Sequence, residues 1–171
     1  MRDNTDIVIN TGPILALVAA LGSLDILASL YRHVVVPKEV ANEILAGGPD
    51  ALGVIEYRGA SFLSKQDRKI HINPYLANIL DLGEASVIQT ALNENIATVC
   101  IDESSGRRIA RLHGLNVTGS IGVILRAKSL GFCSEMDIAT LIKRMRSYGV
   151  WISPQTELAA LKLDVTTNYT D

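Results

Sequence analysis

The sequence predicts an α/β fold built on a central, mostly parallel sheet of about five strands. Short runs rich in β-branched residues alternate along the chain with segments of helical periodicity. Such alternation is typical of βαβ units, whose parallel sheet is covered by helices on both faces. Hydrophobic residues make up 48% of the sequence and aromatic residues only 5%, which indicates a globular core of aliphatic side chains. The expected strands occupy residues 6–10, 33–36, 68–72, 97–101 and 115–118.

The length and charge of the chain limit its class. A chain of 171 residues can bury one good core, so we expect one domain over residues 1–165 and a frayed tail over 166–171. The formal net charge of −2 provides no global field for nucleic acid, so such binding would need a local basic patch. The N-terminal apolar run is too short for a signal peptide or a membrane span, and Cys100 lies in an apolar run typical of a buried thiol. These features favour a reduced, cytoplasmic protein.

Several helix starts are marked by local sequence. Pro13 suits the first position of the first helix, and Pro37 does the same for the helix after the second strand. Asp81 and Glu84 have the spacing of a capping box for a helix that runs to about residue 93. These markers place helices directly after the first two strands and directly before the fourth.

The second half continues the pattern and then changes. Asp102 or Ser104 can cap the helix that follows the fourth strand. After the last parallel strand we expect an amphipathic helix over 134–147, a short edge strand over 149–153 and a final helix over 154–162.

The polar residues at the ends of the strands are the candidate site, because open α/β sheets bind ligands at the carboxyl ends of their strands. Three of the five such places supply carboxylates. The positions are Asn10 and Thr11 after the first strand, Glu39 and Glu43 after the second, Glu84 in the helix before the fourth, Asp102 and Glu103 after the fourth, and Thr118 and Ser120 after the last.

A cluster of carboxylates is costly unless a cation neutralises it, because like charges raise each other's pKa. Oxygen ligands suit Mg²⁺ or Mn²⁺, and such an ion can activate water and stabilise charge on a phosphoryl group. The sequence has no GxGxxG or phosphate-loop motif, and its histidines lack metal-ligand spacing. A hard-cation site for phosphoryl chemistry is therefore the functional interpretation of these acids.

Each acid also has a purely structural interpretation. Glu84 fits a capping box, Asp102 fits an N-cap, and Glu103 fits an exposed or supporting position. Glu39 and Glu43 lie one helical turn apart, as on many solvated helix faces, although Glu43 borders an apolar stripe. The joint placement of the acids, and not any single residue, supports a site.

With these strand-end acids in view, the chain resembles the PIN-domain superfamily. The likeness is strongest to PIN-like bacterial and archaeal proteins related to the toxins of type II toxin–antitoxin systems. The block from Leu80 to Leu125 is the most specific part of the resemblance. The matching segments are "VINTGPILALVAALGSLDIL", "VVVPKEVANEIL", "LDLGEASVIQTALNENIATVCIDESSGRRIARLHGLNVTGSIGVIL" and "GVWIS".

The resemblance implies a three-layer α/β/α fold and a Mg²⁺- or Mn²⁺-dependent ribonuclease site. By position, Glu43, Glu84 and Asp102 match the family's catalytic, metal-binding acids, and the family's first acid falls on Asn10. The expected supporting residues are Thr11, Glu103, Thr118 and Ser120.

Asn10 departs from the family pattern, which usually has Asp at this place. An amide supplies one neutral oxygen where a carboxylate supplies a charged one, so attraction to a cation falls. Three carboxylates still suffice for an ion that keeps several of its waters. Two functions remain open: a metal-dependent ribonuclease, or a PIN-like binding module with weakened catalysis that acts through a protein partner or weak RNA binding.

Partners are expected from both the residues and the resemblance. Arg107, Arg108 and Arg111 share one helix and could contact an RNA backbone, although a solvated helix face explains them equally well. The early helices over 14–21 and 24–30 carry more aliphatic surface than a small sheet needs, which favours a homodimer. A small antitoxin partner is implied by the resemblance alone.

Overall fold

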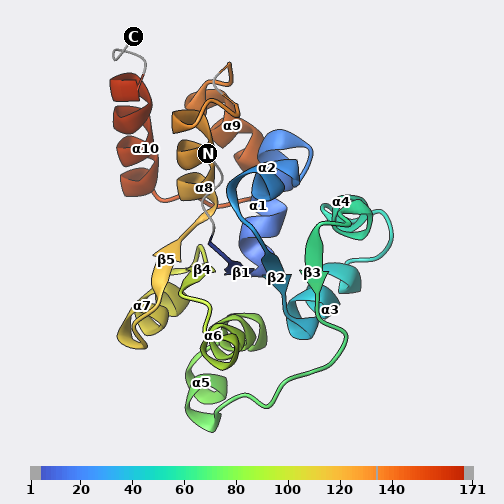
Figure 1. Ribbon diagram of the computed structural model, residues 1–171. Helices are drawn as coiled ribbons and strands as arrows, with labels where there is room; N and C mark the ends of the chain where they lie inside the picture. Colours follow the sequence, from blue (N-terminus) through green and yellow to red (C-terminus); the bar gives the residue numbers. More distant parts are fainter. Residues whose placement is uncertain (1–4, 134, 168–171) are drawn as a thin grey trace.

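The central sheet has five parallel strands in the order β3-β2-β1-β4-β5 (Figure 1). The computed structural model describes residues 5–133 and 135–167, with side chains up to Asp164. The predicted α/β class with a parallel sheet of about five strands is confirmed. The strands are β1 (Ile7–Ile9), β2 (Val34–Val36), β3 (Leu63–Lys65), β4 (Thr98–Cys100) and β5 (Asn116–Thr118).

Helices cover both faces of this sheet, as the predicted three-layer arrangement requires (Figure 1). On one face, α6 (Leu82–Glu94) packs on β1 and β4, α7 (Ser104–Leu112) packs on β5, and α5 (Pro74–Ile79) lies against α6. The helices α1, α8, α9 and α10 pack against one another in the other layer, and α2 lies against α8. Their bounds are α1 (Thr11–Leu21), α2 (Asp25–Leu30), α8 (Ser120–Ser129), α9 (Ile138–Ser147) and α10 (Pro154–Thr167).

The helix α3 (Lys38–Ala46) contacts both α1 and α6, and it also contacts α4 (Val54–Gly59). Its buried residues Val40, Ala41 and Ile44 form one stripe, and the adjacent Glu43 stays exposed at the border of that stripe. Strands β1 and β2 are buried along their whole length, as expected for the centre of a parallel sheet. This packing fixes the strand ends around which the candidate site is built.

Two predicted strands are wrong. The third strand is β3, and residues 68–72 form part of a loop between β3 and α5. Ile70 and Ile72 alternate with polar neighbours, which is the pattern of a strand. The Ile70 backbone N–H, however, donates to a carboxylate oxygen of Glu39 (3.3 Å) and not to a carbonyl of a neighbouring strand. The expected edge strand at 149–153 is also irregular, and its Trp151 is 81% exposed.

The helix ends follow the local signals in part. The Asp81 carboxylate accepts from the Glu84 amide (2.7 Å) and so caps α6 as expected. The prediction for α7 is wrong, because its N-cap position is Glu103, with no side-chain hydrogen bond to the helix. Pro13 is the third residue of α1 and not its first.

Two further helix predictions are corrected, and some helices had no prediction. The helix expected over 134–147 begins at Ile138, while α4, α5 and α8 were not predicted. The last helix, α10, runs to Thr167 and thus two residues into the expected tail; residues 168–171 lie outside the described part of the chain.

The aliphatic surface of α1 and α2 is covered within the chain. Ile14, Leu17, Leu27 and Leu30 are fully buried, and α1 packs against α8 and α9. The excess of apolar surface that favoured a homodimer through these helices is therefore absent. No helix in the described ranges combines the length and the apolar character needed to cross a bilayer.

Candidate metal-binding site

The candidate site lies where the direction of the chain connections changes in the sheet. β1 lies between β2 and β4, so the connections on its two sides run to opposite edges. Ligands of open α/β sheets bind at the carboxyl end of such a switch point. Asn10 follows β1 directly, and its backbone N–H donates to the carbonyl oxygen of Cys100 at the end of β4 (3.0 Å). Asn10 and Asp102 therefore flank this crevice.

The first group of oxygens comes from Asn10, Thr11 and Glu43. The Thr11 hydroxyl donates to Glu43 Oε2 (2.5 Å), which holds α3 against the start of α1. Asn10 is only 7% exposed, and among the described residues no hydrogen-bond donor reaches its buried side-chain oxygen. A buried acceptor without a donor is unusual in folded proteins and is satisfied by a cation as well as by a proton donor.

Gly83 explains how these oxygens come together. A Cβ atom at Gly83 would lie 2.7 Å from both carboxylate oxygens of Glu43 and 2.9 Å from Asn10 Oδ1. The three oxygens thus converge over a bare backbone in the first turn of α6. Only a residue without a side chain leaves this space open.

A second group consists of Asp81, Glu84 and Glu103, whose carboxylate oxygens lie within 4.8 Å of one another. Glu84 is 2% exposed, while Asp81 and Glu103 face solvent. Burial raises the pKa of Glu84 to about 7, and the negative charges of Asp81 and Glu103 add to the rise. The Glu84 carboxyl lies against Gly106 at the start of α7, and the Ser105 hydroxyl lies 3.5 Å from it.

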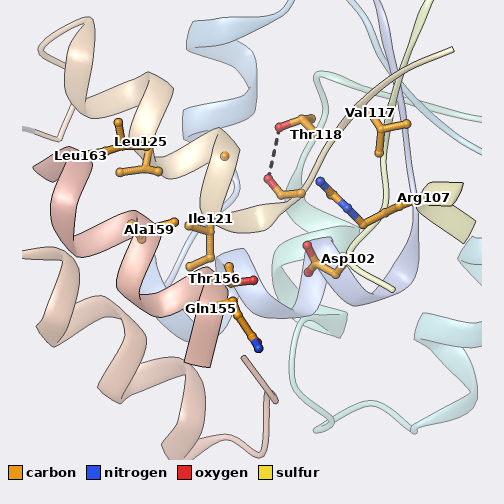
Figure 2. A pocket seen from close by; sticks show the side chains of 13 residues that line it. Asp102, Arg107, Val117, Thr118, Ile121, Leu125, Gln155, Thr156, Ala159 and Leu163 are labelled. Carbon is orange, nitrogen blue, oxygen red and sulfur yellow. Dashed lines mark hydrogen bonds between the residues drawn. The ribbon is translucent and has the colours of Figure 1, made fainter. Parts of the chain in front are cut away.

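Asp102 is held by the start of α8. One of its oxygens accepts from the Ser120 amide (2.7 Å) and the other accepts from the Ser120 hydroxyl (2.9 Å). Burial raises the pKa of the Asp102 carboxyl, although these hydrogen bonds and the charge of Arg107 oppose the rise. Protein atoms surround Asp102 on most sides, but it keeps exposed surface where it lines a cavity (Figure 2).

The predicted arginines have different environments. Arg107 is partly buried, and its Nη1 donates to the Ile101 carbonyl (2.8 Å). It lies beside Asp102 in the close view (Figure 2). Arg108 and Arg111 are exposed on α7. Arg107 therefore has a structural bond at the strand end, whereas the other two have the exposure of an ordinary helix face.

The predicted residues thus form three adjoining groups and not one compact cluster. Asn10, Thr11 and Glu43 form the first, Glu84 and Glu103 belong to the second, and Asp102 and Ser120 form the third. The Thr118 hydroxyl lies 3.4 Å from the Gly119 carbonyl, next to Asp102. Glu39 stands apart, because its buried carboxyl supports the loop at Ile70.

Sequence reasoning treated Asp81 only as a helix cap and missed three glycines. Gly83 faces Glu43, Gly106 faces Glu84, and Gly119 faces Asp102, where a Cβ atom would lie 2.6 Å from Oδ1. Glycine in a helix is unfavourable by about 0.5–1 kcal/mol relative to alanine. Glycines in the first turn of α6 and of α7 were therefore a signal that something else needs the space.

The donor set fits a hard divalent cation. Every candidate ligand is a carboxylate or amide oxygen, and Asn10 Oδ1 has no hydrogen-bond partner in the described part of the chain. Mg²⁺ and Mn²⁺ prefer such oxygens and keep several waters, so few protein ligands are needed. The acidic group of Asp81, Glu84 and Glu103 offers further ligands next to the first group.

Comparison with known proteins agrees with this architecture. A family model described as PIN domain matches residues 6–164, nearly the whole chain. No curated protein and no solved structure gives a significant match. Because the family model spans far more than half of the sequence, the chain belongs to the PIN-domain family.

Proposed function

We propose that this protein is a Mg²⁺- or Mn²⁺-dependent ribonuclease that hydrolyses RNA phosphodiester bonds. The observation that carries the proposal is the convergence of Asn10 Oδ1 and the Glu43 carboxylate over Gly83. The buried amide oxygen of Asn10 has no donor within the described ranges, and the carboxylate of Glu43 is oriented by Thr11. In a PIN domain, this pair at the switch point of the sheet is suited to bind a cation.

Asn10, Glu43, Glu84 and Asp102 are the proposed metal ligands, and the three acids are the proposed catalytic residues. A bound divalent ion would supply an activated water and stabilise charge on the phosphoryl group. Thr11 and Ser120 would hold the carboxylates of Glu43 and Asp102 in place through the hydrogen bonds described above.

Glu84 adds a group that can exchange a proton near neutral pH. Its pKa of about 7 results mainly from burial, so the carboxyl changes charge close to the pH at which a general base works best. A bound cation would favour the ionised form. In the metal-free protein, by contrast, a protonated Glu84 relieves repulsion from Asp81 and Glu103.

A weakened binding module is the second candidate. Asn10 is neutral where the family usually has an acid, and Ser120 engages both oxygens of Asp102. The first feature lowers the charge offered to a cation, and the second occupies lone pairs of the Asp102 carboxylate. This protein would then act through weak RNA binding or a protein partner.

The test is cleavage of a mixed RNA pool during Mn²⁺ titration. The wild type should cut, and Glu43→Gln should cut at least about 100-fold more slowly, because it loses an ionised ligand. Glu56→Gln on α4 serves as the matched control and should cut as the wild type does. Inactive wild type together with an active Asn10→Asp variant would reject the nuclease function for the natural sequence and favour the binding module.

The partners belong to the same proposal. The resemblance supports a toxin role in the cytoplasm, with a small antitoxin and self-association as a homodimer, but the α1 and α2 surface is not available for that dimer. Co-expression with a short protein encoded next to this gene should suppress growth inhibition if the toxin role is correct. Growth inhibition that such a protein leaves unchanged would contradict it.

A further inference from the structure

A cavity of about 520 Å³ lies between α8 and α10, beside the carboxyl ends of β4 and β5 (Figure 2). We propose that this cavity binds one nucleoside of the RNA substrate. This nucleoside would lie next to the phosphate that is cleaved at the proposed metal site. The inference rests on the proposed nuclease function but concerns a separate feature, the recognition of a neighbouring base.

The size of the cavity suits a small organic group. Ligand pockets of proteins usually measure about 300–1,000 Å³, with mostly apolar walls and a few polar groups that fix orientation. Here Ile121 and Leu125 of α8 face Ala159 and Leu163 of α10 (Figure 2). Two aliphatic walls can enclose the flat faces of a base without an aromatic partner.

The cavity is polar where it meets the proposed metal site. Asp102 and Arg107 form part of its lining at that end, with Thr118 next to them. The Arg107 guanidinium is held by the Ile101 carbonyl through Nη1, which leaves further N–H groups for a phosphate oxygen. The change from a charged end to aliphatic walls matches a nucleotide, whose phosphate and base have the same contrast.

Gln155 is positioned to contact a base edge. It is the second residue of α10, it is exposed, and it lines the cavity on the side of Asp102 (Figure 2). Among the described residues, its side-chain amide has no hydrogen-bond partner. The neighbouring Thr156 hydroxyl is already paired with Ser153 (2.8 Å). A free amide with donors and an acceptor is a common reader of base edges, so Gln155 should create a base preference.

The first test is binding of the four nucleoside 5′-monophosphates to the metal-free protein, followed by backbone amide NMR. Nucleotides should shift the amides of Gly122, Gln155 and Ala159, with a preference for one base, whereas inorganic phosphate should shift only those near Arg107. Ala159→Leu should weaken nucleotide binding about tenfold by filling the cavity. The control Ala139→Leu adds the same side chain at an exposed site on α9 and should bind as the wild type does.

Gln155→Ala should retain binding and lose the base preference. If nucleotides shift the same amides as inorganic phosphate and no others, the proposal is overturned. A protein segment would then be the remaining candidate occupant of the cavity. Equal nucleotide affinity of Ala159→Leu and wild type would overturn it too.

A second measurement separates this inference from the nuclease proposal. With an RNA oligonucleotide and Mn²⁺, Ala159→Leu should raise KM about tenfold with little change in kcat, because it removes binding and not chemistry. If Ala159→Leu cleaves RNA with the KM of the wild type, the cavity is not a substrate subsite, while the nuclease function stands. Nucleotide binding in the cavity of a protein that cuts no RNA would reject the nuclease function and leave the ligand class intact.

Discussion

The side-chain oxygen of Asn10 and the carboxylate of Glu43 converge over the bare backbone of Gly83, although Asn10 follows β1 and Glu43 lies on α3. Thr11 fixes the carboxylate by a hydrogen bond (2.5 Å), while the Asn10 oxygen has no donor among residues 5–133 and 135–167. Burying an unsatisfied amide oxygen costs about 1–3 kcal/mol. A cation that both oxygens bind would remove this cost, so metal binding should also stabilise the fold.

Gly83→Ala tests whether the open space matters. The added methyl group would lie 2.7 Å from the Glu43 oxygens, so we expect Mn²⁺ affinity to fall about tenfold as the exposed carboxylate moves away. Stability should change by less than about 1 kcal/mol, since alanine is the better helix former. Isothermal titration and urea denaturation measure the two effects.

Gly59→Ala is the matched control for that variant. Its added methyl group would meet nothing within 4 Å, and it lies on α4. It should leave Mn²⁺ affinity unchanged. If Gly83→Ala binds Mn²⁺ as tightly as this control does, the oxygens at Gly83 are not the metal site.

The pH dependence of stability should reveal Glu84. Its pKa is about 7 in the folded protein and ordinary in the unfolded chain, near 4.5, so the folded state binds the extra proton between these values. The free energy of unfolding of the metal-free protein should therefore fall as pH rises from about 4.5 to 7. At pH 8, Glu84→Gln should be more stable than the wild type by roughly 1–2 kcal/mol, a figure that allows for solvent screening of the exposed neighbouring charges. At pH 5 the two proteins should have similar free energies of unfolding.

The measurement for Glu84 is urea denaturation of both proteins with a chelator over this pH range. The difference between the two curves isolates this one carboxyl. Parallel curves from pH 5 to pH 8 would show that Glu84 ionises normally in the fold.

Lys128 and Asp164 form a buried ion pair that joins α8 to α10, the two walls of the cavity (3.0 Å). Lys128 also donates to the Met136 carbonyl, and Asp164 accepts from the Ile138 amide (3.3 Å). Removing one partner leaves a buried unpaired charge, so Lys128→Met should cost about 3–5 kcal/mol. Replacing both, as Lys128→Met with Asp164→Leu, should recover much of that loss in a double-mutant cycle followed by thermal unfolding. Additive losses would show that the two side chains do not act as a pair.

Local chemistry explains which parts of the fold could be predicted. The cap of α6 depends on Asp81 and Glu84, three residues apart, and it was found from spacing alone. The third strand was misplaced because the alternation at Ile70 and Ile72 is local, whereas strand pairing is decided by tertiary contacts. Leu63 pairs with Val34, and a buried Glu39 holds the segment at Ile70 in a loop.

The candidate site, like the fold, could be predicted only in part. The switch point of the sheet follows from strand order, so the neighbourhood of Asn10 could be anticipated. The approach of Glu84 to Gly106 and of Asp102 to Gly119 could not be anticipated, because the residues of each pair are far apart in the sequence and meet only in the packed fold. Asp102 was one of two candidate caps for the helix after β4, but its carboxylate instead accepts hydrogen bonds from Ser120 at the start of α8.

Saturable Mn²⁺ binding is the measurement that tests the central claim most directly. Titration of the wild type, followed by the EPR signal of free Mn²⁺, should show at least one bound ion per chain. The Mn²⁺ affinity should fall about tenfold or more in Glu43→Gln and rise in Asn10→Asp, because ligand charge sets the affinity for a hard cation. The absence of saturable binding in the wild type, or equal affinity in all three proteins, would contradict a metal site formed by Asn10 and Glu43.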